Sequence, residues 1–197
     1  MKLSLGAALA VLAIAFPSAN SALAANGPHI LIFDRQAVMN GSKLGENIRQ
    51  QIMAYEQKAQ TDLGPEGQAL QTQSQALQQM PAAVRAKKGQ ELQAKETAYR
   101  QKVQDQQSMI QGGELAARKR YMTEEAAIVH AIMTERGADA VLIKAAVVDS
   151  AGGTDITRDV IARLDKKITG FKVPLVKPSL ADQLQMMQQQ QQQQQQQ

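Results

Sequence analysis

The sequence predicts an α+β protein in which a small β-rich body carries a long antiparallel α-helical hairpin. Three observations predict this fold: a short run of β-forming residues near the start, two long helical stretches separated by a proline, and further β-forming residues after them. The chain has 197 residues, of which 44% are hydrophobic but only 3% are aromatic. Because aromatic rings supply much of the buried area of an ordinary domain, a large compact core is not expected.

The first 24 residues are predicted to be a signal peptide. Lys2 precedes an apolar run that ends at Pro17, and Ala22, Leu23 and Ala24 supply the small-x-small pattern that a signal peptidase accepts. A membrane anchor is the alternative, but about 14 apolar residues are fewer than the roughly 20 that span a bilayer. We therefore expect the mature chain, from residue 25, to work outside the cytoplasm.

Residues 25–41 and 137–177 are predicted to form the body. Ile30–Phe33 has no polar alternation, which is typical of a strand that is covered on both faces. A unit as small as these two segments buries only about 60% of its unfolded-chain surface. We therefore expect the body to associate with other copies of itself, as a homo-oligomer.

The second segment of the body is predicted to hold three more strands and a short helix. The strands are Ala140–Ile143, Ala145–Val148 and Phe171–Val173, and Thr154 or Asp155 should cap the helix. The residues expected in the core and in subunit association are apolar members of these elements, namely Ile30, Ile32, Phe33, Val141, Leu142, Ile143, Val147, Val148, Ile156, Val160 and Leu164.

Residues 42–136 are predicted to form the hairpin, with its tip near residues 80–84. Apolar residues recur at steps of three, four and seven after the N-cap Ser42, in a stripe as narrow as a coiled-coil seam. Pro81 interrupts the helical pattern, and Gly137 ends it. The pairs Gly64-Pro65 and Gly112-Gly113 should kink or bend the arms.

Two segments of the sequence, ILIFDRQAVMNGSKLGENI and ERGADAVLIKAAVVDSAGGTDITRDVIARLD, flank a Gln-rich and charge-rich hairpin. Together they resemble the OmpH/Skp family of periplasmic chaperones. This resemblance implies a homotrimer whose bodies associate and whose hairpins surround a central cavity. It also implies that unfolded outer-membrane proteins are held in this cavity without ATP before they insert into the outer membrane.

Reasoning from the residues agrees with a holdase function. Flexible side chains on the arms can adapt to varied apolar segments, and the candidate client-binding residues are Met53, Met80, Met109 and Met122. The alternative for each methionine is that it only fills the seam of the hairpin. For the whole protein, the alternative is a structural coiled-coil protein of the envelope, or an adaptor that binds one folded partner.

The stretch near the tip is locally basic. Its basic residues are Arg85, Lys87, Lys88, Lys95, Arg100 and Lys102. They could attract anionic lipid or lipopolysaccharide phosphates as further partners, or they could form a solvated face balanced by Glu56, Asp62 and Glu66. The net charge of the whole chain is only +4, which does not predict a nucleic-acid binder.

No pattern predicts an enzyme, a cofactor or a metal site. The chain has no cysteine, and His29 and His130 lie far apart without ligand spacing around them. Asp155, Thr157 and Asp159 alternate as in a calcium loop, but helix capping explains Asp155. Residues 178–197 form a Gln-rich tail of low complexity, to which the sequence assigns no function.

Overall fold

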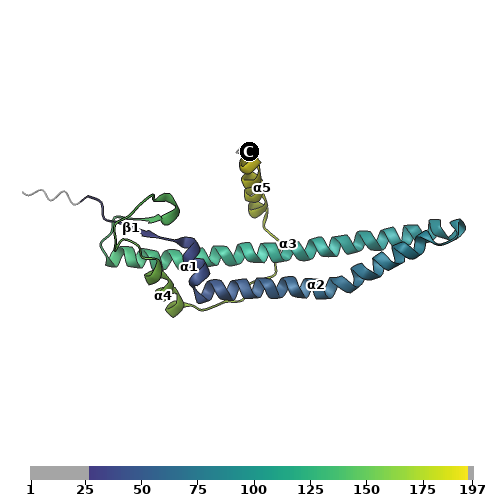
Figure 1. Ribbon diagram of the computed structural model, residues 1–197, viewed down its shortest axis with the longest axis horizontal. Helices are drawn as coiled ribbons and strands as arrows, with labels where there is room; N and C mark the ends of the chain where they lie inside the picture. The colour runs from purple at the N-terminus through teal and green to yellow at the C-terminus, as the bar shows by residue number, and fades with distance from the viewer. Residues whose placement is uncertain (1–26, 195–197) are drawn as a thin grey trace, which may run out of the picture.

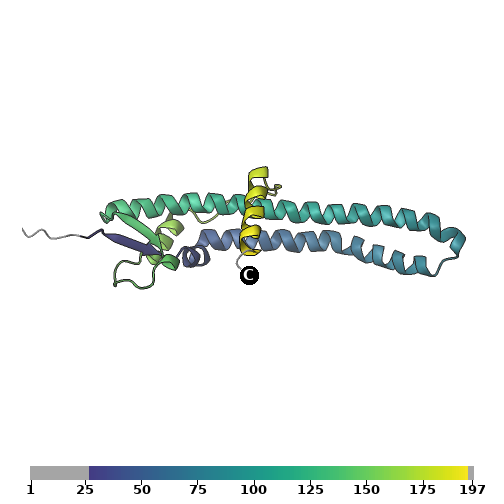
Figure 2. The ribbon, with the colours of Figure 1, turned by 90° about the horizontal axis from the view of Figure 1, so that it is seen from above.

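The structure is a computed structural model that describes residues 27–194, so the predicted signal peptide lies outside the described residues. A small α+β body stands at one end of a long helical hairpin, which confirms the predicted fold class (Figures 1 and 2). In chain order the elements are β1 (Ile30–Phe33), α1 (Arg35–Gly41), α2 (Lys43–Gln78), α3 (Ala82–Glu135), β2 (Ala140–Ile143), the 3₁₀ turn η1 (Lys144–Ala146), α4 (Thr157–Lys167) and α5 (Leu180–Gln194).

The strands β1 and β2 pair in parallel, with Ile30 opposite Ala140 and Phe33 opposite Ile143. On its other side β1 is bonded to the segment just before α4, because Ile32 N–H donates to the Thr154 carbonyl (2.9 Å) and Ile156 N–H donates to the Ile32 carbonyl (2.8 Å). The prediction of a strand at residues 145–148 is wrong, because the chain turns at η1. Both edges of β1 are already hydrogen-bonded, so no position beside it is left for a further strand. The N-cap position of α4 is held by Ile156 and not by Thr154 or Asp155, although the carboxylate of Asp155 accepts from Thr157 N–H (2.9 Å).

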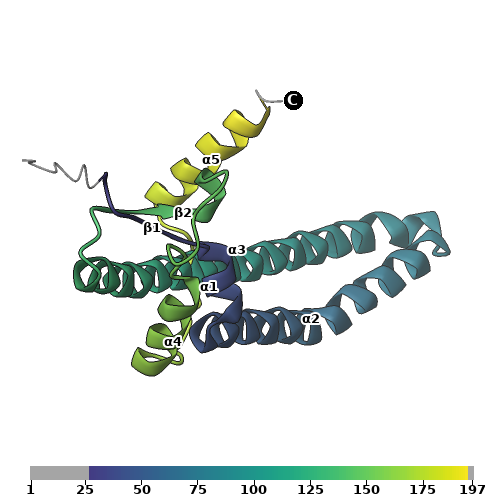
Figure 3. The same ribbon diagram turned by 60° about the vertical axis from the view of Figure 1, so that its left-hand side comes forward.

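The core of the body is completed by the bases of the two arms. Leu44 of α2, Tyr121 and Ile132 of α3 and Leu164 of α4 are fully buried in one cluster with strand β1. Figure 3 shows α1 and α4 at this base. The body is therefore not made only of residues 25–41 and 137–177, because its apolar surface is buried against helices of the hairpin.

The structure places the predicted body residues in three environments. Ile32, Phe33, Ile156, Val160 and Leu164 are buried, and Ile30, Val141 and Val147 are half-buried. Leu142, Ile143 and Val148 are exposed in the single chain, so they are not part of its core. Among the described residues, no strand pairs with the outer edge of β2, which leaves this end of the sheet open.

Both arms run through the residues expected to interrupt them. Helix α2 continues past Pro65 without a break, although it changes direction in its distal half (Figures 1 and 3). Helix α3 continues through Gly112 and Gly113, and both glycines are buried. Both helices stay continuous because α2 and α3 pack against each other along the hairpin. This packing offsets the free-energy cost of placing proline and glycine inside a helix.

The chain after α4 crosses the hairpin in an extended conformation. We call residues 170–178 the C-terminal strap. The strand predicted at Phe171–Val173 is wrong: the main chain of the strap bonds to side chains of α2, and not to the sheet. Beyond the strap, α5 projects away from the hairpin (Figure 3), so the Gln-rich tail is helical as far as Gln194.

We predict that Leu164→Ala lowers the free energy of unfolding by about 2–5 kcal/mol, because the leucine is fully buried where α4 meets the arms. Urea unfolding followed by circular dichroism measures the loss. Leu180→Ala is the matched control, since Leu180 is 72% exposed and its truncation should change stability by less than about 0.5 kcal/mol. An equal loss in both variants would contradict the shared core.

Candidate functional site

A cavity of about 990 Å³ lies at the base of the hairpin. It lies between α1, α2, α3 and the start of η1. Its apolar lining comes from Met39, Ile48, Ile52, Met53, Tyr121 and Met122. Because Met53 is 58% exposed and Met122 is 40% exposed, the cavity presents mobile apolar side chains to solvent.

Arginine side chains surround this apolar lining. Arg49 donates to the carbonyl oxygens of Met39 (3.1 Å) and Asn40 (3.1 Å), which ties α2 to the end of α1. Arg118 also lines the cavity, and it forms no ion pair with any residue that the structure describes. Asp34 and Glu114 also line the cavity, so it combines apolar contact with charges of both signs at its rim.

A buried carboxyl lies behind the cavity. Glu125 of α3 is 1% exposed and pairs with Arg35 of α1 at 2.8 Å, while its second oxygen has no hydrogen-bond partner among the described residues. Burial raises the pKa of the Glu125 carboxyl, and the guanidinium of Arg35 only partly opposes this effect. Burial likewise raises the pKa of the neighbouring Tyr121 hydroxyl to about 12.

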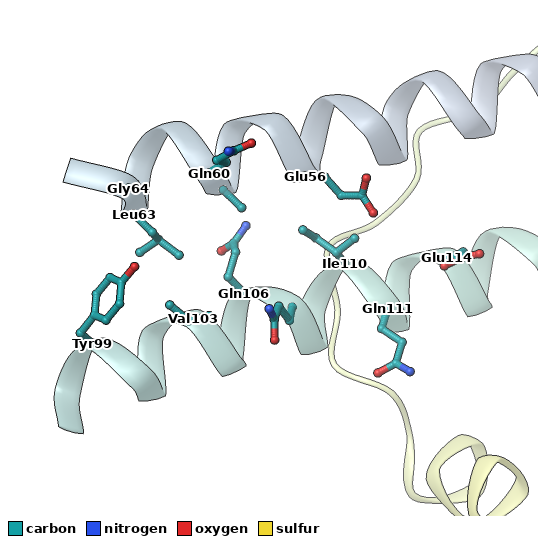
Figure 4. Close-up of a pocket in the computed structure, with 12 residues that line it drawn as sticks. Glu56, Gln60, Leu63, Gly64, Tyr99, Val103, Gln106, Ile110, Gln111 and Glu114 are labelled. Carbon is teal, nitrogen blue, oxygen red and sulfur yellow. The ribbon is translucent and has the colours of Figure 1, made fainter. Parts of the chain in front are cut away.

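A second hollow of about 570 Å³ lies between the two arms. Figure 4 shows Leu63 of α2 and Tyr99, Val103 and Ile110 of α3 around this space, with polar side chains such as Gln60 and Gln106 beside them. This mixed lining differs from the cluster of buried apolar side chains at the base, which includes Tyr121, Ile128 and Ile132. The arms are therefore less tightly joined here than at the body.

The structure brings together two of the four predicted client-binding methionines. Met53 and Met122 both line the cavity at the base, whereas Met80 lines a small hollow at the tip. Met109 is half-buried on α3 and lines neither of these hollows. The assignment of any of these residues to client binding stays a prediction.

Sequence reasoning missed the residues that α1 brings to the cavity. Met39 and Arg35 lie on this short helix, which the sequence analysis did not predict. A signal for it exists, because Asp34 accepts a hydrogen bond from Ala37 N–H (2.9 Å) as an N-cap does. Asp34 directly follows the strand and so marks the start of a new helix.

The basic residues near the tip differ in their partners. Lys102 pairs with Glu66 on the other arm at 2.9 Å, and Arg85 donates to the Gln78 and Met80 carbonyls (3.3 and 2.7 Å) at the end of α2. Lys95 and Arg100 donate only to neutral side chains, those of Gln73 and Thr97. Lys87 and Lys88 form no ion pair with residues 27–194. The positive charge at the tip is thus only partly neutralised.

Helical spacing in the sequence favours ion pairs between the basic cluster Arg118-Lys119-Arg120 and Glu114, Glu124 and Glu125 of the same helix. The structure shows other partners. Lys119 pairs with Asp182 of α5, and Arg120 lies over the Phe171 ring at 4.2 Å. Glu124 and Glu125 pair instead with Lys167 and Arg35. These partners belong to segments distant in the sequence, so helical spacing alone did not predict them.

Among residues 27–194, no group of three or more His, Cys, Asp or Glu side chains could hold a metal ion. His29 and His130 are both exposed, and His29 N–H donates to the carboxylate of Asp139 (2.7 Å). Asp159 pairs with Arg136 and Arg163. Within the same range, no helix is long and apolar enough to cross a membrane.

A small α+β body with a long two-helix hairpin, hollowed where the two join, defines a class of helical-hairpin proteins. The chain belongs to the OmpH-like family, because the family described as outer membrane protein (OmpH-like) matches residues 29–164. A solved structure from Caulobacter crescentus, described as that of an OmpH-like outer membrane chaperone, shows the same fold with a TM-score of 0.68 and 23% identity. The match covers 78% of this chain and 92% of that protein. No curated protein sequence matches the chain significantly.

We predict that Glu125→Gln gains stability relative to the wild type as the pH rises from 4 to 7. Above its raised pKa, the folded wild type holds a buried carboxylate that the unfolded chain exposes to water. Below the ordinary value of 4.5 the carboxyl is protonated in both states, so the cost disappears. Urea unfolding of both proteins at several pH values measures the difference, and a difference that falls with rising pH would contradict the burial effect.

Proposed function

We propose that the protein is an ATP-independent holdase chaperone of the periplasm, which binds unfolded outer-membrane proteins and prevents their aggregation before membrane insertion. The observation that carries this proposal is the cavity of about 990 Å³ at the base of the hairpin, where Met53 and Met122 are exposed. Membership of the OmpH-like family supports the proposal. The periplasmic location also follows from the signal peptide that the sequence predicts.

The chemistry of the cavity suits clients of varied sequence. Methionine has an unbranched, polarisable side chain that fits many apolar shapes, and such contacts are individually weak. Several weak contacts on one polypeptide add up through multivalency, and each can be released without fuel. An unfolded β-barrel precursor offers many such contacts, because its strands alternate apolar and polar residues.

We further propose that the bodies associate as a homotrimer. Leu142, Ile143 and Val148 are exposed apolar residues at β2 and just after it, and no described segment pairs with the outer edge of β2. An exposed apolar strand edge favours pairing with another chain. Bodies joined at this surface would hold several hairpins around a shared space, in which a client makes contacts with more than one arm.

The positive charge at the tip supports a second contact, with anionic lipid or lipopolysaccharide phosphates. Lys87 and Lys88 are exposed and form no ion pair with a described residue. Each such charge contributes about 1 kcal/mol near an anionic surface. A tip that touches the membrane surface would bring the client close to its destination.

We predict that the protein suppresses the aggregation of an unfolded outer-membrane β-barrel protein, measured by light scattering after dilution from urea. The double variant Met53→Gln, Met122→Gln should suppress it several-fold less, because polar amides replace the apolar lining. Met187→Gln is the matched control, since Met187 is 52% exposed and does not line the cavity. A folded wild type without any effect on aggregation would favour a structural protein or an adaptor for one folded partner.

We predict that Val148→Asp shifts the protein from trimer to monomer. Val148 is fully exposed in the single chain, so its replacement removes no packing within the chain, whereas a charge inside a subunit contact is costly. Size-exclusion chromatography with multi-angle light scattering gives the mass, and circular dichroism checks the helices. A monomeric wild type would contradict the trimer itself.

A further inference from the structure

The C-terminal strap is held through its main chain. The amide of Gln51 on α2 donates to the Phe171 carbonyl (2.7 Å) and accepts from Val173 N–H (2.9 Å). One turn along, the Tyr55 hydroxyl donates to the Val173 carbonyl (2.8 Å). These three bonds reach only atoms that every extended polypeptide carries, so they do not depend on the sequence of the bound segment.

Helix α3 offers the strap a surface without side chains. A methyl group on Gly112 would overlap the Val176 carbonyl, and one on Gly113 would overlap the Pro174 carbonyl. The two glycines therefore let an extended main chain lie directly against the helix. Gln51, Tyr55, Gly112 and Gly113 together form what we call the strap groove.

The first half of the strap alternates in burial. Phe171 is half-buried and Val173 is fully buried, whereas Lys172 and Pro174 are exposed. Val173 is fully buried in the groove, and the Phe171 ring lies beneath the guanidinium of Arg120. Alternation with period two is also the pattern of the strands of an outer-membrane barrel, so the strap and such a strand present similar chemistry to the groove.

The far end of the strap is held at the surface. Leu175 and Val176 are 41% and 44% exposed, and Lys177 pairs with Asp105 of α3 at 2.7 Å, with both side chains in solvent. Solvent-exposed ion pairs contribute little to stability. The strap also lies outside residues 29–164, which match the family. The strap is buried at Val173 and again at Pro178, with an exposed stretch between these two residues.

We propose that the strap groove is a binding site for extended peptide segments of alternating apolar character, and that residues 170–178 occupy it in cis until such a segment displaces them. The identity of the client rests on the proposed holdase function. The capacity of the groove to bind an extended peptide does not.

The first test uses a fluorescent peptide of residues 168–179 as the probe and the full chain as the receptor. Fluorescence anisotropy should show at least tenfold tighter binding to Val173→Asp than to the wild type, because the strap of this variant no longer fills the buried site. A probe with the same Val173→Asp change should not bind. If Val173→Asp loses helical content, Phe171→Ala replaces it, since this change removes the contact between the Phe171 ring and Arg120 and leaves Val173 unaltered.

Blocking the groove supplies the control. Gly113→Ala in the Val173→Asp background should abolish probe binding, because the added methyl occupies the position of the bound main chain. Gly64→Ala is the matched change, since a methyl group there has no atom within 4 Å, and it should leave binding intact. Equal binding in both glycine variants, or no binding to a folded chain with a loosened strap, would overturn the proposal.

The second test follows hydrogen exchange of the wild type by mass spectrometry. The amide of Val173, protected by Gln51, should exchange faster when a saturating unfolded barrel protein or the probe is added. If the Val173 amide stays protected while the barrel protein is bound, the strap is a permanent part of the fold, and its proposed displacement is overturned. If no barrel protein binds but the variant with the loosened strap binds the probe, the result supports the groove as a peptide-binding site and contradicts the holdase function.

Discussion

The packing of the arm bases against the small sheet is the contact on which the rest of the structure depends. Tyr121 and Ile132 of α3 and Leu44 of α2 are fully buried in one cluster with β1 and α4. Neither part could bury its apolar surface alone, because the sheet has two strands and the arms extend far beyond it. The same contact fixes the direction of the hairpin, and it creates the corner between α1, α2 and α3 that forms the larger cavity.

Cohesion between the arms falls with distance from this base. Near the body α3 buries Tyr121, Ile128 and Ile132, whereas toward the tip the buried apolar side chains are sparse, with Leu70 on α2 and Leu92 on α3. Polar residues such as Gln60 and Gln106 line the gap between the arms. Weakly packed segments open at low free-energy cost. A rigid base with adaptable arms suits the proposed binding of clients of different shape.

The sequence predicted what depends on local chemistry. Ile30–Phe33 and Ala140–Ile143 are strands, and Ser42 caps α2 through a hydrogen bond from Gly45 N–H (3.2 Å), because β-propensity and capping act over a few residues. The β-forming run at 145–148 did not become a strand, since the ladder position beside β1 was taken by Thr154 and Ile156. Of the candidate site, the sequence indicated Met53 and Met122, but not that α1 would bring Met39 beside them. Such neighbours depend on tertiary packing.

Gly112 and Gly113 show why a local cost can indicate a tertiary contact. In a helix considered alone, each glycine loses about 1 kcal/mol relative to alanine. In the folded chain both are buried beneath the main chain of the strap, which any side chain would displace. The same pair therefore weakens the isolated helix and permits the closest approach of another segment in the protein. Because Gln51 and Tyr55 bond only to the main chain of the strap, this surface selects an extended backbone, while the buried Val173 side chain adds a requirement for an apolar residue at one position. Such limited selectivity suits the proposed binding of many different clients.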